Sequence, residues 1–159
     1  MVKKNSRMIM CIVLLGYLVI LIDNSLVFTC SNQIGASFAM TTSATTWVSN
    51  GYALTFGSLL LLGGRLGDIF SRKKIFSYGL AIFGISSLCV GLSPNSTFLI
   101  IARSVQGCGS AIIAPATLAI IMDNFHGAAQ QRAIIMYGAM SGIGISLGLI
   151  VGAGITTIA

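Results

Sequence analysis

Five apolar segments, each about as long as a bilayer is thick, constrain the fold of this chain more than any other feature. They cover residues 8–30, 44–62, 75–92, 97–122 and 133–158. An α-helix needs about 20 apolar residues to cross the hydrocarbon core of a bilayer. The spacing therefore predicts an all-α protein, a polytopic transmembrane bundle with five spans joined by short linkers.

The charge content excludes an ordinary soluble domain. Only 8% of the residues are charged and 55% are hydrophobic, whereas a soluble domain carries about 25% charged residues. The net charge of +6 is compatible with nucleic-acid binding, but the basic residues lie in short linkers between apolar segments. That placement is typical of membrane topology. We therefore expect the lipid bilayer, and no nucleic acid, among the partners.

The basic residues alternate between the two sides of the predicted bundle. They precede the first span (Lys3, Lys4, Arg7), follow the second (Arg65, Arg72, Lys73, Lys74) and follow the fourth (Arg132), and the other two linkers carry none. Lys and Arg are enriched in cytoplasmic linkers of membrane proteins. The pattern predicts a multi-pass protein of the cell membrane with a cytoplasmic N-terminus. The first span is too long for the apolar region of a signal peptide.

The residues that usually carry cofactor or enzyme chemistry are sparse. The four Cys lie inside or at the ends of apolar segments without C-x-x-C spacing, and His126 is the one histidine. We expect no disulfide framework, no metal site and no cofactor. With three acidic residues and no nucleophile–base constellation, the sequence indicates that the protein is not an enzyme.

Two charged residues, Asp23 and Arg103, fall well inside predicted spans. At 1.5 Å per residue, Asp23 lies about 10 Å from the outer end of the first span, and Arg103 about 9 Å from that of the fourth. Charges at such depth usually face a bundle interior and have a partner. We predict that the two pair, the alternative being that each extends separately to the interface. A carboxylate beside a guanidinium stays ionised, whereas an unpaired one takes up a proton.

Small residues recur at four-residue intervals in the last span. One row comprises Gly144, Gly148 and Gly152, and a second comprises Gly138, Gly142 and Ser146. Such rows let helices approach closely in lipid. They predict close packing of the fifth span against its neighbours.

The densest cluster of charge is the segment 64–74, Gly-Arg-Leu-Gly-Asp-Ile-Phe-Ser-Arg-Lys-Lys, which we expect to be a loop at the membrane surface. It resembles the loop motif of the major facilitator superfamily, G-x-L-a-D-r-x-G-r-k, with Ile69 and Ser71 as departures. The segment 103–111 is similar to the fourth-helix motif of the drug:proton antiporters of that superfamily, R-x-x-q-G-x-g-a-a.

Three further segments carry the resemblance. Residues 47–54 look like the start of helix two in the branch with fourteen spans, and residues 21–25 are similar to its first-helix motif, l-D-x-T. Residues 144–153 resemble the fifth-helix motif g-x-x-x-G-P-x-x-G-G, with Leu149 in the position of proline. The order and spacing of these motifs match from residue 8 to the end of the chain.

The resemblance implies roles for individual residues. Asp68 and Arg72 belong to a cytoplasmic gating relay, in a loop motif that also contains Gly64 and Lys73. Arg103 is implicated in proton coupling with Asp23 as its partner. Gln106 and Gly107 form the setting of Arg103 in the same motif.

The resemblance also implies a function, the proton-coupled efflux of drugs or other amphipathic compounds, with a small-molecule substrate and protons as partners. Such carriers are built from three-helix repeats, with the substrate site between two bundles. Five spans would form an incomplete N-terminal domain over residues 1–159, and the C-terminal half would be a missing partner. We then expect Asp68 to bond locally to Arg72 or to be hydrated. The alternatives are a truncated, non-transporting membrane protein, a small interaction protein that packs through its glycine rows, and an uptake carrier.

Overall fold

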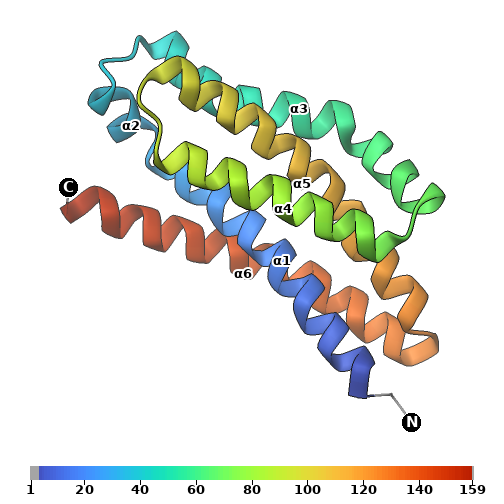
Figure 1. The fold of residues 1–159 in the computed structure, drawn as a ribbon. Helices are drawn as coiled ribbons and strands as arrows, with labels where there is room; N and C mark the ends of the chain where they lie inside the picture. The colour runs from blue at the N-terminus through green and yellow to red at the C-terminus, as the bar shows by residue number, and fades with distance from the viewer. Residues whose placement is uncertain (1–3, 159) are drawn as a thin grey trace.

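The computed structural model describes residues 4–158, and for residues 4–7 and 158 only the backbone. Lys3 lies outside the described residues, as do the side chains of Lys4 and Arg7. Six helices follow one another in this part of the chain (Figure 1): α1 (Lys4–Thr29), α2 (Ser31–Ser37), α3 (Thr42–Ile69), α4 (Arg72–Gly91), α5 (Ser96–Asn124) and α6 (Gly127–Ile158). The all-α prediction is confirmed, but the number of helices is six rather than five.

Four of these helices are long and apolar enough to cross a membrane: Met8–Thr29 in α1, Arg72–Gly91 in α4, Ser96–Asn124 in α5 and Gly127–Thr157 in α6. The expected span 44–62 lies within α3, which has the required length at 28 residues but is not one of the four. Its first turns are rich in Thr and Ser. The long helices α1, α3, α4, α5 and α6 nevertheless pack into one bundle (Figure 1).

The predicted loop 64–74 is wrong in its extent. Helix α3 continues to Ile69 and α4 begins at Arg72, so that only Phe70 and Ser71 connect them. The Phe70 amide still donates a helical hydrogen bond to the Leu66 carbonyl, at 2.9 Å. Hydropathy marks where a helix leaves the lipid, whereas its backbone hydrogen bonds continue into water until a turn interrupts them.

The other linkers also differ from expectation. The segment 31–43 contains the short helix α2, which packs on α3 where Gly35 meets Thr45. The linker 123–132 is reduced to Phe125 and His126, because α5 runs to Asn124 and α6 begins at Gly127. Gly127 has φ +58°, a left-handed conformation that glycine adopts without strain. Between the third and fourth expected spans, a short turn connects the end of α4 at Gly91 to the start of α5 at Ser96.

Helix α5 is the centre of the bundle. It packs along α3 and α4, while α1 pairs mainly with α6 and reaches α5 along a smaller contact. Glycines permit the closest approaches around α5: a Cβ on Gly109 would lie 2.8 Å from the Phe83 nitrogen, and one on Gly63 would meet the Ala111 carbonyl. The α1–α5 contact is the one that matters for the site, because it brings Asp23 to Arg103.

The first glycine row holds α6 against α1. A Cβ would lie 2.7 Å from Leu21 at Gly144, 2.5 Å from Ser25 at Gly148 and 2.8 Å from Thr29 at Gly152. The close packing predicted for this row is confirmed. The prediction is wrong for the second row within the described part of the chain, since a Cβ on Gly138 or Gly142 would meet nothing within 4 Å.

Candidate functional site

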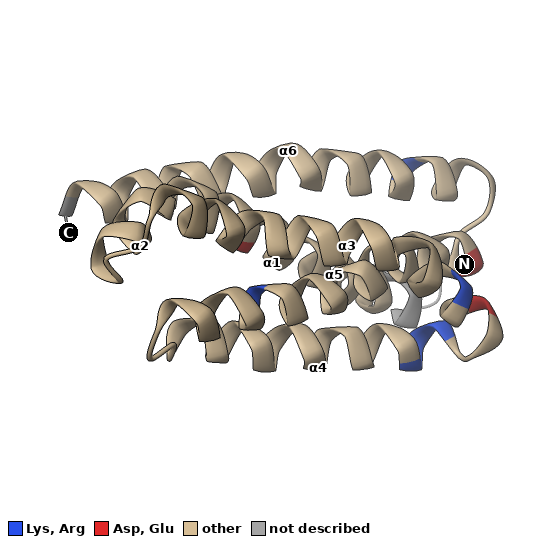
Figure 2. Ribbon diagram, turned by 90° about the horizontal axis from the view of Figure 1, so that it is seen from above, with Lys and Arg blue, Asp and Glu red and all other residues tan. Residues whose placement is uncertain are grey.

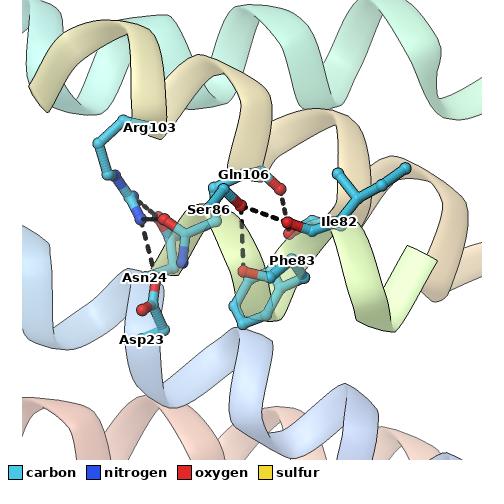
Figure 3. Close-up of polar contacts among 8 residues, drawn as sticks. Asp23, Asn24, Ile82, Phe83, Ser86, Arg103 and Gln106 are labelled. Atoms are coloured by element: carbon cyan, nitrogen blue, oxygen red, sulfur yellow. Dashed lines mark hydrogen bonds and ion pairs between the residues drawn. The ribbon is translucent and has the colours of Figure 1, made fainter. Parts of the chain in front are cut away.

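Asp23 of α1 and Arg103 of α5 form an ion pair inside the bundle (Figure 3), with 2.8 Å between Arg103 Nη1 and Asp23 Oδ2. The Arg103 side chain is 0% exposed and that of Asp23 is 19% exposed. The predicted pairing is confirmed, and the alternative of two separate side chains at the interface is wrong. The pair links helices that are otherwise in limited contact.

Three further side chains hold the Arg103 guanidinium. Its Nη1 donates to Gln106 Oε1 at 2.6 Å, and its Nη2 donates to Asn24 Oδ1 at 3.3 Å. The guanidinium lies over the Tyr52 ring, 4.4 Å from the centroid, where the ring face attracts a cation. Helices α1, α3 and α5 therefore all contribute to one site.

Asn24 and Tyr52 were missed as site residues by sequence reasoning. Both lie inside segments that the motifs had marked, 21–25 and 47–54, but neither carries a charge that would single it out in an apolar helix. Asn24 is the neighbour of Asp23 in the chain. Tyr52 comes from a different helix, so only the packing of α3 on α5 reveals its contact with Arg103.

Gly107 explains why Tyr52 can reach Arg103. A Cβ at Gly107 would clash with the Thr55 hydroxyl and with the Tyr52 carbonyl, so glycine is needed for α3 to lie this close to α5. Thr55 Oγ1 reinforces the approach by donating to the Ser104 carbonyl of α5 at 2.8 Å. Gly107 thus acts through packing, one helical turn from Arg103.

The two formal charges of the site face one another at a depth where an isolated charge would be expensive. Gln106, Asn24 and Tyr52 add uncharged contacts to the Arg103 guanidinium. The Arg103 Nε and Gln106 Nε2 atoms are buried without a hydrogen-bond partner, so the network retains unused donors.

A second charged cluster joins the ends of α3, α4 and α5. Arg72 Nη2 lies 3.2 Å from Asp68 Oδ1, and Arg72 Nη1 lies 2.7 Å from Asp123 Oδ1. Nη1 also donates to the Ala119 carbonyl at 3.0 Å. The expected local bond between Asp68 and Arg72 is confirmed. Asp123 was missed, because it lies at the end of an apolar segment, 51 residues from Arg72 in the chain. Only the fold brings the two side chains together.

The remaining residues of the loop motif contribute less. Lys73 is exposed on the first turn of α4. A Cβ at Gly64 would make ordinary contact with Pro115, at 3.7 Å. Most Lys and Arg lie at the end of the bundle with the α3–α4 and α5–α6 connections, and charge within α1 and α5 is the exception (Figure 2). Twenty residues of α5, or about 30 Å, separate Arg103 from Asp123.

Comparisons with known proteins agree with this architecture. The family model of the Major Facilitator Superfamily matches residues 13–159. In structure, the chain is similar to a bacterial homologue of the human lysosomal transporter Spinster, solved in an inward-facing and unoccupied conformation. The TM-score is 0.80 at 20% sequence identity, and the match covers 94% of this chain and 31% of the other. At this identity the likeness concerns the fold alone.

Several other proteins are more similar to this chain in sequence than the transporter of known structure is. The chain is 39% identical to the uncharacterized MFS-type transporter EfpA of Mycobacterium tuberculosis over 86% of its length. It is 37% identical to the puromycin resistance protein pur8 of Streptomyces alboniger over 89%, and 33% identical to a methylenomycin A resistance protein of Bacillus subtilis over 91%.

The matches cover only part of each relative. The chain spans 26% of the length of EfpA, 28% of the puromycin resistance protein and 31% of the methylenomycin A resistance protein. With the family model matched over most of the sequence, this chain belongs to the major facilitator superfamily, a family of multi-pass membrane transporters.

Proposed function

We propose that this chain forms the N-terminal part of a proton-coupled exporter of drugs or other amphipathic compounds. The observation that carries the proposal is the ion pair between Arg103 and Asp23 within two helices apolar enough to span a membrane. Charged residues at that depth are costly and mark ion pathways and proton relays. The resistance named in two of the relatives supports export as the direction of transport.

Asp23 carries the proton in this mechanism. In the ionised state it holds α1 against α5 through Arg103, over a contact that few other residues share. A proton on Asp23 weakens that attraction and favours a different arrangement of the two helices. A proton can shift the equilibrium between conformations only through such a differential interaction. Loss of the proton then restores the ion pair and resets the carrier.

The Arg72 cluster is proposed as part of the gate at the cytoplasmic end. Arg72 connects the last turn of α3 to the last turns of α5 through Asp68 and Asp123. About half of the surface of each Asp side chain remains exposed. Asp68 is therefore accessible to a helix end from the C-terminal half of the transporter, where a carboxylate is favoured by the positive N-terminus of a helix.

The cytoplasmic orientation of the N-terminus is part of the same proposal. It rests on the basic residues near the α3–α4 and α5–α6 connections, which cytoplasmic sides of membrane proteins favour. A single cysteine at position 71, in a protein whose four native cysteines are replaced, should react with a membrane-impermeant maleimide only after cell lysis. A cysteine at position 94 should react in intact cells, and the reverse result would invert the topology.

The transport proposal is tested on the full-length gene product that contains this chain, expressed in cells that lack their own drug exporters. Dye efflux should be lost in Asp23→Asn and Arg103→Ala, while Asp23→Glu keeps a carboxylate and should retain part of it. In everted vesicles, substrate addition should dissipate a preformed proton gradient. Unchanged efflux in both Asp23→Asn and Arg103→Ala, at equal protein levels, would remove these residues from the mechanism.

A further inference from the structure

A cavity of about 900 Å³ opens between α1, α3, α5 and α6. None of the residues that line it is Asp, Glu, Lys or Arg. Two of its lining residues, Asn24 and Tyr52, are the same ones that contact Arg103. The cavity therefore borders the ion pair without exposing a formal charge of its own, and its volume is in the range of sites for drug-sized ligands.

Aromatic side chains provide the flat surfaces of this cavity. Tyr17 of α1 and Tyr137 of α6 stack with ring centroids 4.3 Å apart and planes 19° apart. Tyr52 and Phe56 of α3 lie with their planes 5° apart and centroids 6.1 Å apart. All four residues line the cavity. Two nearly parallel aromatic pairs therefore form part of the cavity wall, one between α1 and α6 and one within α3.

The Tyr17–Tyr137 pair is held in place before any ligand arrives. The Tyr17 hydroxyl lies 3.3 Å from Ser141 Oγ on α6, and both rings are partly exposed rather than fully buried. A pair that is fixed in orientation loses little freedom when a ligand binds, which favours affinity. Its accessible ring surface can extend the stack onto a third aromatic ring.

We propose that this cavity binds planar polycyclic aromatic compounds and that Tyr17 and Tyr137 select flat compounds over non-planar ones of equal charge. Ionic recognition contributes little, because the one carboxylate nearby, Asp23, is engaged by Arg103. Stacked rings attract one another through their quadrupoles, and a delocalised cation is attracted to a ring face. As a substrate class for the exporter, this inference rests on the proposed function, whereas the binding site itself does not.

The test compares two monovalent lipophilic cations, planar ethidium and tetrahedral tetraphenylphosphonium. Binding of each is measured with the purified full-length protein in detergent. In Tyr17→Leu and Tyr137→Leu we expect ethidium affinity to fall about threefold to tenfold, as the loss of one aromatic stack implies, with less than a twofold change for tetraphenylphosphonium. Tyr17→Phe keeps the ring and should bind ethidium as the parent protein does.

A matched control replaces an exposed tyrosine outside the cavity, Tyr78, by Leu and should change neither affinity. A merely structural role for the pair would weaken both cations equally, and that result would overturn the inference, as would a parent protein that binds tetraphenylphosphonium but not ethidium. The binding measurement and the transport measurement test the two proposals separately. Selective ethidium binding without proton-driven transport contradicts only the proposed function, and proton-driven transport with equal losses for both cations contradicts only the inference.

Discussion

Two arginines hold aspartates in this bundle, and their surroundings differ more than their chemistry. The Arg103 side chain is 0% exposed and pairs with an Asp23 that is 19% exposed. The Arg72 side chain is 31% exposed, and its partners Asp68 and Asp123 are 51% and 53% exposed. The distance of the buried pair, 2.8 Å, lies between those of the two exposed pairs, 2.7 Å and 3.2 Å, so burial rather than distance separates the two clusters.

Because the two clusters differ in burial, removing one partner should have a different effect on stability in each. Removing one partner of a buried pair leaves an uncompensated charge, which costs about 3–5 kcal/mol. An exposed pair is screened by water and contributes about 0–1 kcal/mol. The Arg103 cluster is therefore expected to contribute more to stability, whereas the Arg72 cluster can open and close at little cost, which is compatible with the gate proposed above.

The largest effect is expected for Arg103→Ala. Asp23 would lose its charge partner inside the bundle, and we expect a loss of about 3–5 kcal/mol of stability, seen as a lower thermal transition in detergent. Adding Asp23→Asn should restore a large part of this stability but none of the proton coupling. If the double variant were as unstable as the single one, the cost would come from lost packing rather than from the unpaired charge.

The next effect is expected for Gly148→Leu, which tests whether the buried pair depends on the seating of α1. A larger side chain at this position would meet Ser25 and the Ile22 backbone of α1, and overpacking of this kind costs about 1–3 kcal/mol. Displacing α1 also moves Asp23, so proton coupling should fall while the Arg72 cluster is untouched. Gly142→Leu is the control, because a Cβ at that position would meet no other helix within 4 Å in the described part of the chain. Equal losses in the two variants would contradict this account.

A smaller effect is expected for Arg72→Ala. Its ion pairs are partly exposed, so the loss of stability should be about 1 kcal/mol or less and should shrink further at high salt. The rate of efflux should nevertheless fall clearly, because the ends of α3 and α5 are no longer joined by ion pairs. Thermal unfolding at two salt concentrations, measured beside efflux, checks both parts, and a destabilisation as large as that of Arg103→Ala would erase the contrast between the clusters.

The smallest effect separates the two partners of Arg72. The bond to Asp123 is shorter than that to Asp68, at 2.7 Å against 3.2 Å. We expect Asp123→Asn to lower stability by a few tenths of a kcal/mol more than Asp68→Asn, within the range for exposed pairs. Unfolding temperatures of the two variants, compared with that of the double variant, provide the measurement. The opposite order would show that the local bond within the α3–α4 connection is the stronger one.

A large part of the fold was predictable, because the requirement to cross a bilayer acts on each segment of the chain separately. A chain in a bilayer must hide its backbone polar groups in helices, so apolar segments of sufficient length predict helices directly. The ends of those helices were less predictable. The segment 64–74 was expected to be a loop, yet all but Phe70 and Ser71 are helical, since charge does not prevent a helix from extending beyond the lipid.

The candidate site was predictable to the extent that charge marked it. Asp23 and Arg103 were found because a charge inside an apolar helix calls for a partner. Asn24, Tyr52 and Asp123 were missed. An amide, an aromatic ring or a carboxylate at a helix end does not indicate, in the sequence alone, a contact with a distant arginine. The two glycine rows were indistinguishable by spacing, and only one of them contacts α1.

The sequence by itself determined that this protein lies in a membrane, where its long helices run and which family its motifs match, because hydropathy and local charge act along the chain. The tertiary structure alone decided which side chains meet. The glycines of α6 let α1 pack closely on α6, and Gly107 lets α3 pack closely on α5. The bundle then places Asp23, Asn24 and Tyr52 around one guanidinium. Contacts between helices depend on their relative rotation, which a hydrophobic pattern nearly uniform around each helix does not specify.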